Sequence, residues 1–244
     1  MLHHVSDAIK PTRRERSRLA TVDEIKATAL SIMREQGATD VKFTDIARAM
    51  GMTAPALYRY FADRDELLTA LIVDGYRGLG VRIATAREAV DASDVGGRWL
   101  AVATAYRLWA REEPQQFALV LGLPVPGYAA PDEGPTTEAA KGAMDQLAGL
   151  LVSAAADGRL GKPLIREVSE SLADCERTHH KGLDATVPPA SFQAMLLTWS
   201  MLHGFASLEA YGHLDWLTPE ARDALFLSQV RLAARAAGIP EPPA

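Results

Sequence analysis

Side chains that could bind a nucleic-acid backbone gather between residues 44 and 64. Hydroxyl and cationic groups are the donors that proteins use toward phosphate oxygens. This stretch supplies them at Thr44, Thr53, Tyr58, Tyr60 and Arg64. Tyr60 could equally be a core residue, and Arg48 could be a solvated helix residue rather than a contact with the backbone. The chemistry expected here is the positioning of a protein on phosphates.

Base-edge contact would need a long donor on the same surface. Arg59 is the one such residue between residues 53 and 60, so it is the candidate for a guanine edge, with a phosphate as the competing partner. Ala54, Pro55 and Ala56 are small, which permits close approach and apolar contact with thymine methyl groups.

The formal net charge of −5 is unfavourable for such a role, but the basic residues are concentrated near the N-terminus. Residues 10–18 carry five Lys and Arg against a single acidic residue. We expect residues 1–20 to form a flexible basic arm that reaches DNA, with a solvated tail as the alternative. The arginines concerned are Arg13, Arg14, Arg16 and Arg18.

Two short helices joined by a tight turn are expected to carry these side chains. Thr44 can cap the first helix and Thr53 the second, while Pro55 falls in a first turn, where its missing N–H costs nothing. Gly51 stands between them, where a chain leaving a helix often needs a left-handed residue. The pattern predicts a helix-turn-helix, followed by a longer helix from Asp63.

Within this stretch, Thr-Asp-Ile-Ala, Gly-Met-Thr, Ala-Leu-Tyr-Arg-Tyr-Phe and Arg-Asp-Glu-Leu-Leu stand in one order and spacing. In these motifs, residues 21–71 strongly resemble the DNA-binding domain of the tetracycline-repressor (TetR) family of bacterial regulators. The resemblance implies a homodimer on a palindromic double-stranded DNA operator and a small-molecule effector bound in the C-terminal half. It also implies phosphate contacts at the donor positions named above.

The rest of the chain predicts an all-α fold, because no stretch shows sustained strand alternation. Further helices are expected at residues 21–36, 63–90, 98–113, 116–122, 137–156, 163–181, 191–211 and 219–237. The predicted organisation is a basic arm (1–20), a helix-turn-helix domain (21–66) and a helical ligand-binding and dimerisation domain (67–244). No apolar run is long enough to cross a membrane, and one cysteine, Cys175, fits a reducing cytoplasm.

The last two helices are unusually apolar, which favours either a core within the chain or a four-helix bundle with a second copy. The resemblance favours the dimer, because such regulators pair through their last two helices. The residues expected in the interface are Phe192, Met195, Leu202, Phe205, Leu208, Leu225, Phe226 and Val230.

Large apolar side chains could instead line a pocket for a mostly apolar ligand. The candidates are Trp99, Tyr106, Trp109, Phe117, Met144, Met195, Trp199 and His203, each with plain core packing as the alternative. Trp199 with His203-Gly204, together with Leu-Pro-Val-Pro-Gly-Tyr at 123–128, resembles the TetR subgroup named WHG after its Trp, His and Gly motif.

Other functions find little support in the sequence. His179 and His180, with Cys175 and Glu176, have the i, i+4 spacing of paired metal ligands, but no second pair is apparent and we expect no metal or cofactor. The chain has no Gly-rich phosphate loop, nucleophile elbow or convincing triad, so an enzyme is not expected. The remaining alternative is a DNA-binding regulator or architectural factor controlled by protein partners without a small-molecule ligand.

Overall fold

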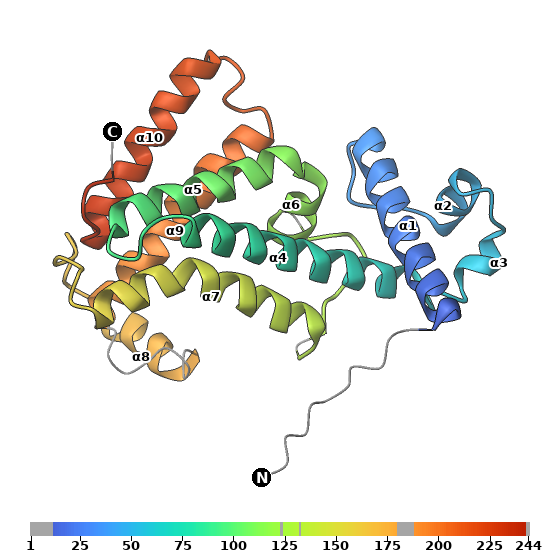
Figure 1. Ribbon diagram of the computed structural model, residues 1–244, viewed down its shortest axis with the longest axis horizontal. Helices are drawn as coiled ribbons and strands as arrows, with labels where there is room; N and C mark the ends of the chain where they lie inside the picture. The colour runs from blue at the N-terminus through green and yellow to red at the C-terminus, as the bar shows by residue number, and fades with distance from the viewer. Residues whose placement is uncertain (1–11, 123, 132, 180–187, 243–244) are drawn as a thin grey trace, which may run out of the picture. The chain divides into compact units, whose positions relative to one another are not determined.

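The computed structural model describes residues 12–122, 124–131, 133–179 and 188–242, and within them all regular structure is helical, as predicted (Figure 1). The helices are α1 (Arg13–Gln36), α2 (Phe43–Ala49), α3 (Ala54–Leu57), α4 (Arg64–Glu88), α5 (Val95–Glu112), α6 (Pro114–Leu121), α7 (Pro135–Ala156), α8 (Glu170–His179), α9 (Pro189–Ala210) and α10 (Pro219–Ala237).

The chain divides into two compact units. The first contains the chain up to Leu71 together with the short segment Pro124–Ala129, and the second contains 72–123 and the chain from Ala130 onward. The predicted domain border after residue 66 therefore differs from the observed one, because the first two turns of α4 and a distant six-residue segment pack with the helix-turn-helix.

In the first unit, α1, α2 and α3 enclose a small apolar core. Ile25, Met33, Ile46 and Leu57 are almost fully buried, at 1% exposure or less. Gly51 has a φ of 64°, which lets the chain turn sharply between α2 and α3. The N-cap of α2 is Lys42, two residues before the predicted cap Thr44, and neither Lys42 nor Thr53 caps through its side chain.

The basic arm is a correction to the sequence analysis. α1 begins at Arg13, and Thr12 and Glu15 form a complete capping box at its start. The arginines assigned to a flexible arm therefore project from a helix whose first turn is locally capped. The part of the arm before Thr12 lies outside the described residues.

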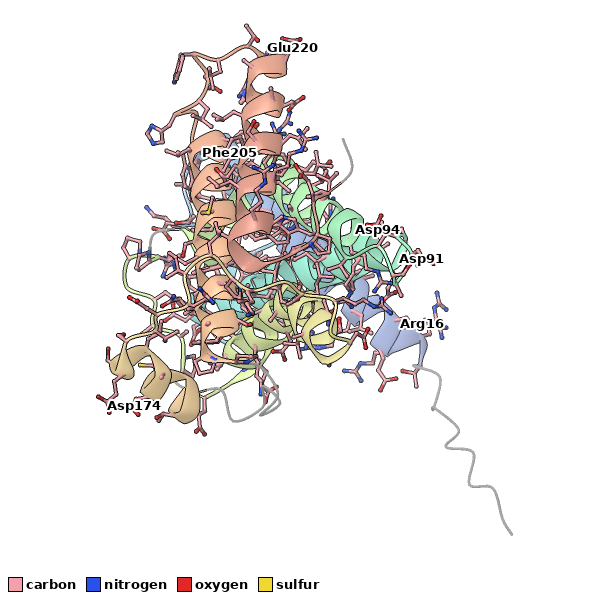
Figure 2. The ribbon with its side chains drawn as sticks, turned by 90° about the vertical axis from the view of Figure 1, so that its left-hand side faces the viewer. Arg16, Asp91, Asp94, Asp174, Phe205 and Glu220 are labelled. Atoms are coloured by element: carbon pink, nitrogen blue, oxygen red, sulfur yellow. The ribbon has the colours of Figure 1, made fainter. Side chains whose placement is uncertain are left out.

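In the second unit, α5 packs against α9, and α9 and α10 form an antiparallel hairpin (Figure 1). Trp109, Tyr106 and Phe117 lie at its centre, each at 1% exposure or less. Thr218 caps α10, Pro219 occupies its first position and Gly238 ends it at a φ of 72°, as the sequence predicted. Figure 2 labels Phe205 on α9 beside α10, where its ring centroid lies 5.3 Å from that of Phe226.

α8 is shorter than predicted, because residues 160–169 do not continue a helix. Their backbone bonds to the end of α10 instead: Gly161 N donates to Gly238 O at 2.7 Å, and Leu164 N donates to Ala236 O at 3.1 Å. These bonds use carbonyl groups that a helix C-terminus leaves without internal partners.

Candidate nucleic-acid interface and apolar cavity

The segment made of α3 and the two residues after it, Tyr58 and Arg59, presents a short exposed face away from the core of the first unit. Its one fully buried side chain is Leu57, while Pro55, Tyr58 and Arg59 are exposed and Ala54 and Ala56 are half-buried. The ring of Tyr58, 57% exposed, lies 5.1 Å from that of Phe43, which holds the base of the tyrosine against the core. The exposed group is therefore the one that the sequence singled out for base and phosphate contact.

Arg18 of α1 is attached to the end of this face. Its guanidinium donates a hydrogen bond to the Arg59 carbonyl at 2.9 Å, and its central carbon lies 5.3 Å from the centroid of the Tyr60 ring. The Arg18 guanidinium therefore makes one hydrogen bond and one cation–π contact within the protein. Arg18 is predicted from the sequence to contact DNA, but its contact with Arg59 could not be predicted, because the two residues lie 41 positions apart.

The start of α1 and the end of the α3 segment line one open basic hollow. Its walls include Arg13, Arg14, Arg18, Arg59 and Tyr60. Glu15 also lies there, but Thr12 hydrogen bonds to its carboxylate and lowers its pKa, so this acid remains committed to the helix cap. The hollow gathers arginine guanidinium groups beside a helix start, a combination suited to phosphate oxygens.

The two other arginines predicted to contact DNA, Arg48 and Arg64, differ in how strongly they are bound within the protein. The Arg48 side chain is 78% exposed and its single described ion pair, with Asp45, is a surface contact at 3.3 Å. Arg64, in contrast, donates through Nε to Asp40 at 2.9 Å and also reaches the Pro126 carbonyl at 3.4 Å. Arg64 is therefore already bonded to two partners inside the first unit, and its contact with a phosphate stays a prediction.

The segment that Arg64 contacts forms a tight turn. Tyr128 N donates to Val125 O at 3.1 Å, Pro126 precedes Gly127, and Gly127 has a φ of 74°. Proline followed by a left-handed glycine is the signature of a type II turn. The Tyr128 hydroxyl also lies 3.0 Å from the Thr69 hydroxyl, so the turn is held to α4 at a second point.

In the second unit, a chain of aromatic contacts surrounds His203. Its Nδ1 shares a hydrogen bond of 2.9 Å with the Tyr106 hydroxyl, and its ring stacks on Trp199 with centroids 5.5 Å apart and planes at 11°. Burial lowers the pKa of His203 and raises that of Tyr106, so the imidazole is held neutral and the phenol protonated.

An apolar cavity of about 260 Å³ lies between α7 and α9. It is lined by Met144, Asp145, Leu147, Ala148, Met195, Leu196 and Trp199. A smaller void, of about 20 Å³, is lined by Trp99, Leu147, Leu151, Met195, Thr198, Trp199 and Leu202.

These linings divide the predicted pocket residues into two groups. Met144, Met195 and Trp199 line the larger cavity, and Trp99 lines the small void. The remaining four, Tyr106, Trp109, Phe117 and His203, line neither of these two cavities and contact one another in the aromatic cluster of the second unit. The lining residues Leu147 and Ala148 were missed because nothing in their own spacing separates a cavity wall from a core.

The predicted dimer residues also divide by exposure. Phe192, Leu202, Phe205, Phe226 and Val230 are buried in the protomer, at 4% exposure or less. These five are therefore corrected to internal positions, while Met195 is half-buried and lines the cavity. Leu208 and Leu225 are 46% exposed, and so are, to a similar extent, Leu197 and Leu232 on the same two helices, which were not among the predicted interface residues.

Two further types of site receive no support from the described residues. No group of three or more His, Cys, Asp or Glu side chains there could hold a metal ion, and His180 of the candidate metal pair lies outside them. Within the same ranges, none of the helices is both long and apolar enough to span a bilayer.

Comparison with known proteins agrees with this architecture. Residues 25–71 match the model for bacterial regulatory proteins of the tetR family, and residues 99–233 match the model described as tetracyclin repressor-like, C-terminal domain. The chain is 33% identical over 223 residues to the HTH-type transcriptional regulator Rv1816 of Mycobacterium tuberculosis, covering 86% of this chain and 91% of the relative.

Solved structures show the same fold. The structure of the protein SCO4313 is 34% identical, with a TM-score of 0.71 over 91% of this chain and 98% of that one. The TetR family transcriptional regulator PfmR of Thermus thermophilus, at 18% identity and a TM-score of 0.55, covers 86% of this chain and 97% of that one and shows the fold alone. The relatives named as regulators are transcription factors rather than enzymes.

Proposed function

Since the chain belongs to the TetR family of transcriptional regulators, we propose that it is a repressor that binds a palindromic operator as a homodimer. We further propose that a small, mostly apolar ligand in the second unit releases it from DNA. The observation that carries the proposal is the exposed α3 face beside a helix start rich in arginine, within one small folded unit.

Recognition of the operator would combine two kinds of contact. Thr44, Thr53 and Tyr58, together with the arginines at the start of α1, would bind phosphates and position the unit. Arg59 and the small residues of α3 would reach base edges in the major groove. Because Arg18 holds the Arg59 carbonyl, the backbone that carries the Arg59 side chain is fixed before DNA arrives.

A second copy would explain the apolar surface of the α9–α10 hairpin. Leu197, Met201, Gly204 and Leu208 follow one another at spacings of four, three and four residues on α9, so they lie on one face. A Cβ placed on Gly204 would meet nothing within 4 Å, which shows that this face is open in the protomer and that a partner helix could approach it closely. Leu225 and Leu232, two turns apart on α10, would extend the same seam.

The cavity between α7 and α9 supports a ligand-responsive regulator over one that acts through protein partners alone. Release requires that the ligand favour a conformation that binds DNA poorly, with a coupling of about 1–3 kcal/mol, and DNA must then weaken the ligand by the same factor.

Selection from a random duplex library at about 0.15 M salt, followed by sequencing, tests the DNA-binding part of the proposal. We expect a palindrome whose half-sites lie roughly 34–36 Å apart, or a multiple of that distance, as two identical helix-turn-helix units require. The control is the same selection with the Pro55→Asp variant, which places an anion on the α3 face. Recovery of no consensus from well-folded protein would contradict the proposal.

A further inference from the structure

We propose that residues 160–169, which we call the bridging segment, contact a second copy of this chain beside α9 and α10. The inference rests on the homodimer proposed above and adds a third element to its interface, with Leu164 and Ile165 as the contact residues. From the sequence, only the last two helices were expected to form this interface.

Exposed apolar side chains are concentrated on the bridging segment and the neighbouring hairpin. Among the described residues, twelve large apolar side chains are exposed, and eight of them belong to the bridging segment, to α9 and α10 or to the turn between these helices. Only four lie elsewhere in the part of the chain that the structure describes. A concentration of this kind on one part of a surface is typical of a site of protein–protein contact.

The backbone of the bridging segment is held across the open end of the α9–α10 hairpin (Figure 1). The N–H groups of Gly161 and Leu164 donate to carbonyl groups at the end of α10. On the other side, Gln193 Nε2, near the start of α9, donates to the Glu167 carbonyl at 3.2 Å. The bridging segment therefore joins the end of one hairpin helix to the start of the other.

Two large apolar side chains lie between these anchors and face solvent in the protomer. Leu164 is 67% exposed and Ile165 is 55% exposed. Pro163 precedes them, and its ring and missing N–H disfavour a helix at this point. Neither side chain is buried in the core of the second unit, although the backbone that carries them is held at both ends.

The bridging segment continues the proposed dimer seam from both helices. On the α9 side, Ile165 and Leu197 line the same surface groove, and Leu197 begins the row of residues that we assign to the seam. On the α10 side, Leu164 is bonded to Ala236, which lies one turn beyond Leu232 of the seam. A second copy that covers Leu197 and Leu232 would therefore reach the bridging segment as well.

The size of a stable interface also favours a contribution from beyond the two helices. An interface of standard size involves about 800 Å² and roughly 20–30 residues on each partner. The seam proposed on α9 and α10 has six residues: Leu197, Met201, Gly204, Leu208, Leu225 and Leu232. Further surface beside the seam must take part, and the bridging segment is adjoining surface that carries exposed apolar side chains.

Protection of a thiol at position 165 tests this inference. Ile165→Cys is made in a Cys175→Ser background, and its reaction with Ellman's reagent is followed without DNA in the dimer and in protein made monomeric by Leu208→Glu or by dilution. We expect the thiol to react at least about 10-fold more slowly in the dimer, because reactivity depends on access to the sulfur. Val81→Cys, at an exposed site on α4, is the control and should react at the same rate in both states.

Ile165→Glu measures the contribution of the bridging segment to dimer affinity. Each substitution occurs twice in a two-fold interface, so we expect the dimer Kd to rise about 10- to 100-fold in sedimentation equilibrium. Ile165→Leu keeps an apolar side chain of the same volume and should retain most of the affinity. Val81→Glu should match the wild type, and circular dichroism checks that all variants are folded.

An equal thiol reaction rate in dimer and monomer, or a Kd for Ile165→Glu equal to that of the wild type, would overturn the inference and leave the dimer itself intact. A wild-type protein that stays monomeric at high micromolar concentration would instead reject the proposed homodimer, and this inference with it. Sedimentation of the wild type alone therefore distinguishes the two failures.

Discussion

Arg107 on α5 and Glu209 on α9 form a bidentate ion pair in the interior of the second unit. Arg107 Nε lies 2.7 Å from Glu209 Oε2 and Nη2 lies 2.6 Å from Oε1, and both residues are only 7% exposed. The same guanidinium reaches Asp223 of α10 at 2.7 Å and lies 4.6 Å from the centroid of the Phe226 ring. One side chain therefore connects α5 to both helices of the hairpin that we propose as the dimer surface.

Arg107→Met should lower the free energy of unfolding by about 3–5 kcal/mol, because it leaves the Glu209 carboxylate buried without its partner. Arg235→Gln is the control, since it breaks an exposed pair with Glu241 and should cost no more than about 1 kcal/mol. Urea denaturation at one fixed protein concentration measures both. Adding Glu209→Leu to Arg107→Met should restore much of the lost free energy of unfolding, because the buried carboxylate is then removed as well. A double variant no more stable than Arg107→Met would show that the ion pair itself stabilises the packing of α5 on the hairpin.

Arg59→Ala should weaken operator binding by about 1–3 kcal/mol and relax the preference at one base pair, if Arg59 reads a base edge. Competition with operators altered at single positions measures the effect. Arg111→Ala, an exposed arginine near the end of α5 in the second unit, is the charge-matched control and should change neither quantity. An equal loss on every operator would assign Arg59 to a phosphate instead.

Arg18 and Arg14 should differ in the salt dependence of DNA binding. Arg14→Met should weaken binding and reduce the slope of log affinity against log salt by about 1, as expected when one phosphate contact is lost. Arg18→Met should weaken binding with little change in slope, because its guanidinium positions the Arg59 backbone and the Tyr60 ring. Filter binding across a salt series distinguishes the two; a slope lowered equally by both would make Arg18 a phosphate contact.

Leu208→Glu and Leu225→Glu should each convert the proposed dimer into a monomer, because each would place a carboxylate in an apolar seam. The measurement is sedimentation velocity, with circular dichroism to confirm folding. Val81→Glu serves as the control, since Val81 is 66% exposed on α4. Dimers that survive both substitutions would place the interface elsewhere.

Acidification should destabilise the protein through His203. Burial lowers the folded-state pKa of this imidazole, so between the unfolded and folded pKa values the unfolded chain binds a proton that the folded chain does not. Stability from this source is complete above the unfolded pKa of about 6.5 and falls as the pH drops below it. Wild type should therefore lose more stability than His203→Gln between pH 7.5 and 5.5 in parallel denaturation series. Parallel curves would show that His203 does not titrate differently in the two states.

Local signals in the sequence predicted the elements and the fold class. Thr218, Pro219 and Gly238 predicted the ends of α10, and Gly51 predicted the turn before α3, because capping and left-handed turns depend on a few neighbouring residues. The motifs between residues 43 and 68 predicted the helix-turn-helix for the same reason. The exposed α3 face followed from helical periodicity alone.

Contacts between distant residues were decided only by the tertiary structure. Arg18 meets the Arg59 carbonyl 41 residues away, Arg64 meets Pro126 62 residues away, and Trp99 meets Val230 131 residues away. α9 is apolar around most of its circumference, so its sequence could not show that Phe205 packs inside while Leu208 faces outward. The sequence by itself determined the fold class and the capped ends of α10, because these depend on local backbone preferences, but it did not predict that residues 13–20 are helical or that residues 163–169 are not. Which face each helix buries, and which polar atom is left without a partner, depends on neighbours that only the folded chain brings together.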